Sequence, residues 1–123
     1  MFRRLDVQVK DTVFDPGSSQ KKVYYKTDGQ TTWYKVWIFL EGLDLPYVMG
    51  VTYRLHSSFP DPNRHVKRTV TNPNCQLVLW TWGLFEIKAL VEDKNGRTHE
   101  LVYELQYDKE LSQKGVEFVK VKM

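Results

Sequence analysis

The sequence has little of what marks several common protein classes. It holds one cysteine, Cys75, which excludes an internal disulfide framework and fits a reducing compartment. It contains no run of about 18 apolar residues, so we expect no membrane span. The first residues, MFRRLDVQVKD, lack the apolar segment of a secretory signal. We therefore expect a cytoplasmic protein, or a nuclear one if the cell is eukaryotic.

The net charge is also small, and potential metal ligands are not clustered. The formal net charge is +3, from 18 basic and 15 acidic residues, so nucleic acid is not expected as a partner. The three histidines, His56, His65 and His99, are not paired at ligand spacing, whereas a zinc site usually has clustered Cys or His. We expect no metal and no cofactor.

Alternation of apolar and polar residues is what the sequence does have, and no helical period persists. Residues 5–11, 47–56, 84–93 and 97–107 alternate in this way, which is typical of strands with one buried face. In 47–56 the odd positions are the apolar ones. The stretch WYKVWIFLEG, 33–42, is apolar on both faces and predicts a central strand. The segment DKELSQKG, 108–115, is the only plausible helical turn.

Turn signals divide these strands at short intervals. The clearest is DKNG, 93–96, which predicts a hairpin loop, and further breaks lie at 15–19, 27–30 and within FPDPN and TNPN. About eight short strands at this spacing predict an all-β, immunoglobulin-like antiparallel β-sandwich. The 123 residues suit one domain, 1–123.

The stretch LHSSFPDPNR, 55–64, is the most unusual loop. Residues i and i+2 of an extended chain share a face, so His56 and Ser58 should approach hydrogen-bonding distance. A hydrolase would also need an orienting acid and an oxyanion hole, and no Gly-rich turn such as G-x-S-x-G surrounds these serines. We therefore favour a contact that fixes shape over catalysis.

Two other segments stay open to more than one reading. The basic residues Arg64, His65, Lys67 and Arg68 fit a charged edge strand, or a contact with phosphate or an acidic peptide. In LVLWTWGLF, 77–85, alternation puts Trp80 and Trp82 on one face, as a core pair or as an aromatic wall at a loop tip. Aromatic residues form 14% of the chain, more than a small core needs, which favours some near the surface.

The loop 55–64 and the tryptophan segment 77–85 together resemble parts of the YEATS domain. YRLHSSFPDPNR and, further on, TWGLFEI are similar to its LH-x-SFP-x-P-x-R and GWGEFEI motifs, and WYKVWIFLEG is similar to its upstream aromatic strand. The resemblance covers about residues 33 to 107. Thr81 stands where the family usually has glycine and Leu84 where it has glutamate, features more like the prokaryotic branch.

The resemblance implies a non-enzymatic module that binds acylated lysine, acetyl or crotonyl, in an aromatic slot between two end loops. The partner would be an acylated-lysine peptide or protein. Phe59 and Trp82 would face each other across an open gap, with Phe85 supporting the base. The implied ligand-binding residues are His56, Ser58, Phe59, Thr81, Trp82, Gly83, Phe85 and, at the slot's edge, Trp33.

A flat, uncharged amide suits stacking between Phe59 and Trp82. The buried amide needs hydrogen bonds, which the Ser58 hydroxyl and a backbone group near Trp82 would supply. The alternative is a protein-interaction or sensor sandwich, part of a larger protein, that lacks acyl-lysine binding. Cys75 is expected to be a free thiol with no catalytic part.

Overall fold

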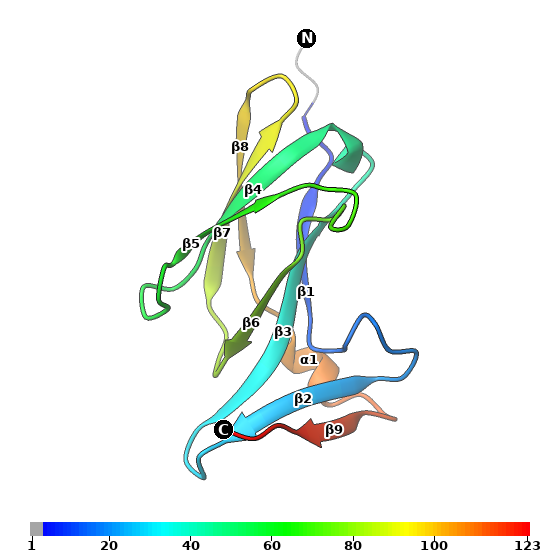
Figure 1. The fold of residues 1–123 in the computed structure, drawn as a ribbon, viewed down its shortest axis with the longest axis vertical. Helices are drawn as coiled ribbons and strands as arrows, with labels where there is room; N and C mark the ends of the chain where they lie inside the picture. Colours follow the sequence, from blue (N-terminus) through cyan, green and yellow to red (C-terminus); the bar gives the residue numbers. More distant parts are fainter. Residues whose placement is uncertain (1–3) are drawn as a thin grey trace.

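The computed structural model describes residues 4–123 and is built almost wholly of strands (Figure 1). The strands are β1 (Gln8–Thr12), β2 (Lys22–Thr27), β3 (Thr32–Glu41), β4 (Val48–Arg54), β5 (Asn63–Lys67), β6 (Leu77–Thr81), β7 (Glu86–Asp93), β8 (Thr98–Glu104) and β9 (Glu117–Lys120). A 3₁₀ turn, η1 (Leu45–Tyr47), and one helical turn, α1 (Asp108–Leu111), complete the described elements. The predicted helical turn is confirmed.

Two sheets pack face to face. One has the order β1-β3-β2-β9, with β6 on the other side of β3, and the other has the order β5-β4-β7-β8. The fold is an immunoglobulin-like β-sandwich, as predicted, and β3 is the predicted central strand because it pairs with β1, β2 and β6. All pairs are antiparallel except β2 with β9, which is parallel and departs from the prediction.

The core lies between the sheets and is supplied by alternate residues. In β7, Ile87, Ala89 and Val91 are fully buried while their neighbours Glu86, Lys88 and Glu92 are exposed. The hairpin between β7 and β8 turns at residues 93–97, with Gly96 at φ +80°. The predicted hairpin is therefore confirmed, including its glycine in the left-handed region.

The odd-position pattern of 47–56 is only half right. Val51, Tyr53 and Leu55 are buried, but Tyr47 and Met49 are exposed and Val48 is buried instead. The pairing with β7 shifts between Val48 and Gly50, and such a β-bulge switches the face on which the following side chains lie. Alternation alone cannot locate this extra residue.

Cys75 is a buried free thiol, and burial raises its pKa to about 11. It stands at φ +53° in the turn before β6, not on a strand. Its carbonyl accepts a hydrogen bond from the buried Tyr53 hydroxyl at 2.7 Å, which fixes that turn to the core. No helix among residues 4–123 is long and apolar enough to cross a membrane.

Candidate functional site

The loop from β4 to β5 is tightly closed on itself. Leu55 donates its N–H to the Pro62 carbonyl at 2.7 Å, and Phe59 donates to the His56 carbonyl at 3.0 Å. Arg64 holds the far side, donating from Nε to the Asp61 carbonyl at 2.6 Å and from Nη2 to the Pro60 carbonyl at 2.7 Å. These bonds fix the direction in which the loop presents its side chains.

His56 and Ser58 form the predicted contact. The two side chains meet at 2.7 Å between Nδ1 and Oγ, and the Ser58 N–H donates to the same Nδ1 at 3.2 Å. A nitrogen that accepts an N–H carries a lone pair, so the imidazole proton belongs on Nε2. The Ser58 hydroxyl then donates to His56 and keeps its own lone pairs for another donor.

The loop from β6 to β7 is held by hydrogen bonds to the Gly83 carbonyl. Thr81 is buried at the end of β6 and its hydroxyl donates to the Gly83 carbonyl at 3.0 Å. The Tyr107 hydroxyl donates to the same carbonyl at 3.2 Å. Burial raises the pKa of Tyr107 to about 12, so this donor keeps its proton at neutral pH. The Gly83 carbonyl is thereby held in place.

Phe59 and Trp82 stack directly on each other. Their ring centroids are 5.5 Å apart with the planes inclined by 27°. A planar group between two rings needs about 3.5 Å on each side, so the predicted open gap between them is wrong for this structure. Stacked in this way, each ring covers an apolar face of the other.

The two rings differ in exposure. Trp82 is 50% exposed, whereas Phe59 is 9% exposed and packs on Phe85 with centroids 5.3 Å apart. His56 also lies edge-on to Phe85 at 6.3 Å. Phe85 thus contacts both His56 and Phe59, and Trp82 is the outer ring of the aromatic cluster.

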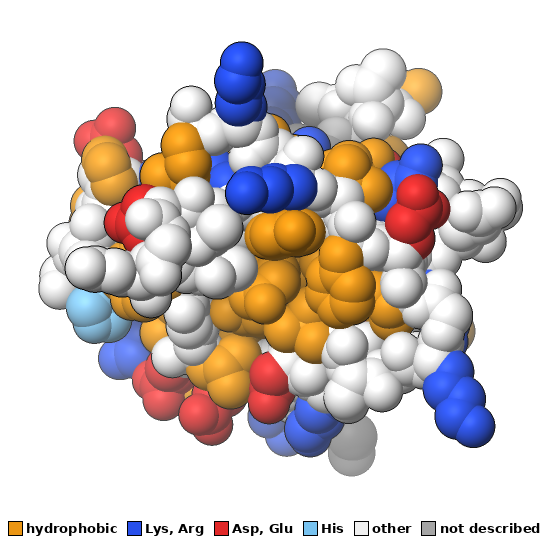
Figure 2. Space-filling view, turned by 90° about the horizontal axis from the view of Figure 1, so that it is seen from below, with side chains coloured by type: hydrophobic (Ala, Val, Ile, Leu, Met, Phe, Trp, Pro, Cys, Tyr) orange, Lys and Arg blue, Asp and Glu red, His pale blue; other side chains and the backbone are white. Residues whose placement is uncertain are grey.

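A cavity of about 110 Å³ opens beside the stacked rings. We call it the end cavity, and it is lined by His56, Thr81, Trp82, Gly83, Leu84 and Phe85. Figure 2, which views the molecule from below, shows hydrophobic side chains gathered in the middle of that face with charged side chains around them. Trp82 and Leu84 each leave about half of their surface exposed, at 50% and 47%.

The structure does not bring every expected residue to the end cavity. Trp33 lies outside it, because alternation along β3 puts Trp33 on the face opposite the buried Val36. Trp80 and Trp82 do not act as one pair either. The Trp80 ring lies under the Lys26 ammonium at 4.5 Å, while Trp82 follows the last residue of β6 and turns to Phe59.

Sequence reasoning missed three residues that build this region. Leu84 lines the end cavity, Tyr107 holds Gly83, and Arg64 clamps the first loop. Arg64 is the last residue of the loop motif LHSSFPDPNR, which was the available signal, but it was considered only within the basic segment 64–68. The long separation of Tyr107 from Gly83 gave no local signal.

Two side-chain arrangements are absent among residues 4–123, a cluster of metal ligands and a carboxylate hydrogen-bonded to His56. Among residues 4–123 no group of three or more His, Cys, Asp or Glu is placed to hold a metal ion. No hydrogen bond of the described residues joins a carboxylate to His56, so the His56–Ser58 pair lacks the third member that orients a catalytic base.

These observations define a class of protein: an immunoglobulin-like sandwich with an aromatic-walled cavity between its end loops. Residues 34–106, more than half of the chain, match the family model described as the prokaryotic YEATS domain. The chain therefore belongs to the prokaryotic YEATS domain family.

Solved structures of YEATS domains share the fold. A structure of the Yaf9 YEATS domain recognizing an H3K122suc peptide has a TM-score of 0.56 and 18% identity, covering 89% of this chain and 81% of that one. The yeast AF-9 homolog protein Yaf9 has a TM-score of 0.51 and 19% identity, covering 82% and 67%. The Yaf9 YEATS domain bound to H3K27ac has a TM-score of 0.50 and 18% identity, covering 86% and 77%. No curated protein matches the chain.

Proposed function

We propose that this chain is a non-enzymatic module that binds acylated lysine at the end cavity. The observation that carries the proposal is the half-exposed Trp82 ring, stacked on a buried phenylalanine beside a cavity lined by both end loops. YEATS domains of the same fold bind acylated histone peptides, which supports a peptide partner. The single free thiol fits a cytoplasmic site of action.

Binding on this proposal opens the Phe59–Trp82 stack. The acyl amide takes the place of Phe59 on one face of Trp82, and the acyl tail enters the end cavity. Losing one aromatic stack costs about 1 kcal/mol, which the amide recovers by stacking in turn. Phe59 is held by Phe85, so the exposed Trp82 is the ring that moves.

The hydrogen bonds of the amide follow from the His56–Ser58 geometry. The free lone pairs of Ser58 Oγ accept the amide N–H, while a backbone N–H beside Trp82 donates to the acyl oxygen. An unmodified lysine brings an ammonium into the same apolar cavity and loses its hydration. Acylation, which removes the charge, is therefore the feature that is recognised.

The cavity volume limits the acyl group. About 110 Å³ is less than the cavity of about 150 Å³ that holds benzene in an engineered protein. We expect short acyl groups such as acetyl or crotonyl to fit. Affinity is weak because little surface is covered and binding carries an entropy cost.

The first prediction tests the outer ring. A fluorescein-labelled Gly/Ser peptide with one acetyl-lysine, crotonyl-lysine or unmodified lysine is titrated with the protein and followed by anisotropy. Trp82→Ala should weaken binding of the acylated peptides by about tenfold or more, the effect of losing an anchor worth at least 1.4 kcal/mol. Its stability loss should be below the roughly 3–5 kcal/mol of a core Trp→Ala change.

Trp80→Ala is the matched control, because it also removes a tryptophan of β6–β7 but one that contacts Lys26 instead of Phe59. It should bind the acylated peptides as the wild type does. Equal binding of acylated and unmodified peptides by the wild type would contradict the proposal.

The alternative is an interaction sandwich in which the aromatic pair only closes the fold. The observation that favours it is the closed Phe59–Trp82 stack. In that case none of the lysine peptides binds, and Trp82→Ala lowers stability without changing any peptide affinity.

A further inference from the structure

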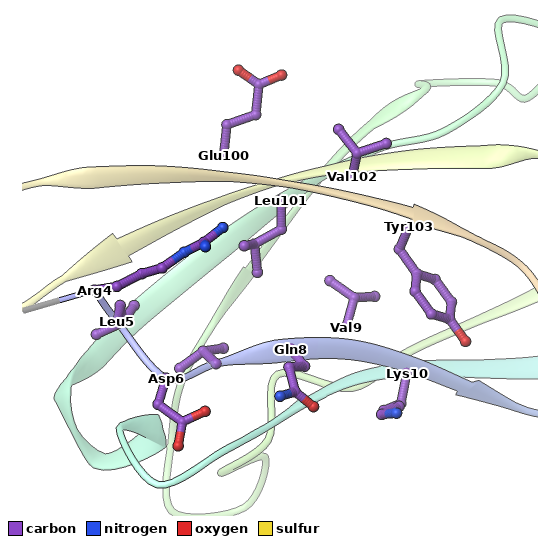
Figure 3. Close-up of a pocket in the computed structure, with 11 residues that line it drawn as sticks. Arg4, Leu5, Asp6, Gln8, Val9, Lys10, Glu100, Leu101, Val102 and Tyr103 are labelled. Carbon is purple, nitrogen blue, oxygen red and sulfur yellow. The ribbon is translucent and has the colours of Figure 1, made fainter.

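A second hollow lies on a different side of the sandwich, between β1 and β8. It has a volume of about 710 Å³ and runs along residues 4–10, which precede and begin β1, and along residues 100–103 of β8 (Figure 3). We call it the edge groove. β1 and β8 are the terminal strands of their sheets, so each turns one unpaired backbone edge toward this groove.

The backbone register identifies which groups of β8 face outward. Asp93 donates its N–H to Arg97 and Leu105 donates to Phe85, so the odd residues of β8 bond to β7. In an antiparallel ladder the residues between them point their N–H and C=O away from that partner. Glu100 and Val102 therefore present their backbone groups along the free edge.

The same reasoning applies to β1. Leu40 of β3 donates its N–H to the Asn74 carbonyl, on the side away from β1. Its register partner Val9 consequently does not bond to β3 and turns its N–H and C=O outward. Asp6 bonds in the opposite direction, since its carbonyl accepts the N–H of Asp44. Val7, between Asp6 and Gln8, faces outward like Val9.

The side chains between these two edges are apolar. Figure 3 shows Leu101 and Val9 pointing into the edge groove from opposite strands, with Glu100 turned away from it. Val102 is 59% exposed on the free edge of β8. Natural edge strands are usually blunted by charge or covered. The edge strand β5 follows that rule with Arg64, His65 and Lys67. β8 carries Glu100 and Glu104, but the exposed Val102 stands between them.

The two ends of the edge groove differ in charge. At one end the Asp11 carboxylate closes it by accepting the Tyr103 hydroxyl and the N–H groups of Gln106 and Tyr107. At the other end Arg4 is exposed and extends along the groove toward Leu101 in Figure 3. Lys10 and Glu100, also at the groove, are paired with Glu41 and Lys88. Asp6 also lines the groove, but its carboxylate is turned away from Leu101 and Val9 in Figure 3. Arg4 is thus the charge that extends along the groove, and it favours an acidic group.

We propose that the edge groove binds an extended peptide segment of a partner protein, which adds a strand to the free edge of β8. Its alternate apolar side chains contact Leu101 and Val9, and an acidic side chain pairs with Arg4. Strand addition of this kind takes affinity from main-chain hydrogen bonds and specificity from alternate side-chain positions. A second copy of the chain is the competing occupant, and the test below distinguishes it from a peptide.

The test uses a synthetic peptide of about eight residues, a usual strand length, alternating valine and threonine with one glutamate. A matched peptide carries N-methyl groups on alternate amides, which removes the strand's hydrogen-bond donors. The first peptide should bind the full chain and slow amide exchange at Glu100 and Val102. The amides of Leu101 and Tyr103, already bonded to β7, should change little.

Val102→Pro provides the blocking variant. Proline removes only an outward N–H here, so the ladder with β7 stays complete. Binding of the valine–threonine peptide should weaken about tenfold, the effect of losing a main-chain hydrogen bond and its pairing. Thr98→Pro is the matched control, since Thr98 also faces outward on β8 but lies outside the groove.

The proposal is overturned if the N-methylated peptide binds as well as the first, or if no binding occurs at millimolar peptide. It is also overturned in favour of self-association if the wild type dimerises without peptide and the same amides become protected. Amide exchange on the wild type decides the question even where Val102→Pro does not fold. Trp82→Ala should leave this binding unchanged, so the outcome is independent of the acyl-lysine site.

Discussion

Substitution of Gly83 can separate an effect on ligand binding from an effect on folding stability. A Cβ added there would meet nothing within 4 Å, and Gly83 does not have a positive φ. The fold therefore does not require glycine at this position. A ligand that approaches the backbone beside Trp82 does require it, because a methyl group would occupy the same open space.

We accordingly expect Gly83→Ala to keep or raise stability by about 0.4–1 kcal/mol, as at other compatible glycines. Acetyl-lysine peptide affinity should fall severalfold in the anisotropy titration. Gly96→Ala is the control: its φ of +80° makes alanine strained, so it should lose stability and keep affinity. Unchanged affinity in Gly83→Ala would remove the backbone from the proposed binding site.

Local spacing explains which site residues could be predicted. The His56–Ser58 contact follows from an i,i+2 relation, and the structure confirms it at 2.7 Å. Trp33 was placed at the site by resemblance alone, and the face of β3 on which it lies decides against it. The closure of Phe59 on Trp82 depends on two loops far apart in sequence, which no spacing rule describes.

At the scale of elements, strands with an unbroken period of two were the most predictable. In β7 and β8 burial follows the predicted alternation over the whole length of each strand. The turn between them is the hairpin that its sequence predicts. The bulge in β4 and the parallel strand β9 were not predictable, because both depend on pairing with a distant strand. The parallel β9 also lies in residues 109–123, where no motif was recognised.

The β7–β8 hairpin carries a pH-dependent anchor. Asp93 is buried, and its carboxylate bonds to His99 Nε2 at 2.8 Å and accepts the N–H groups of Arg97 at 3.0 Å and Asn95 at 2.9 Å. These bonds, that of His99 first, hold the pKa of Asp93 below its ordinary value. Its stabilising contribution is present above the unfolded-state value of about 3.9 and is lost as pH falls through the lowered one.

The melting temperature of the wild type should therefore fall more steeply below about pH 4 than that of Asp93→Asn. At neutral pH the asparagine variant should be the less stable protein, because it keeps one acceptor and loses the charge. Thermal melts across the acid range measure both effects. Glu92→Gln, on the exposed side of the same strand, should follow the wild type. Parallel curves for wild type and Asp93→Asn would show that the anchor does not titrate.

At the scale of the molecule, the two sheets are joined by few polar bonds, and Asp11 makes a cluster of them. Its carboxylate, from β1 of one sheet, accepts the Tyr103 hydroxyl of β8 and the N–H groups of Gln106 and Tyr107 just beyond it, both at 3.0 Å. Burial and this carboxylate both raise the pKa of Tyr103, so its hydroxyl remains a donor across the neutral range. Asp11 thus closes the sandwich at one end of the edge groove.

Asp11→Ala should lower the free energy of unfolding by about 2–3 kcal/mol, the range for hydrogen bonds to a charged group. Urea unfolding measures this, and an unchanged slope would show that the loss is one of stability alone. Asp28→Ala is the matched control, because Asp28 also accepts two N–H groups, of Gln30 and Thr31, but within a single turn. It should lose clearly less. If the two variants were equally stable, the Asp11 bonds would contribute no more to stability than bonds within a single turn.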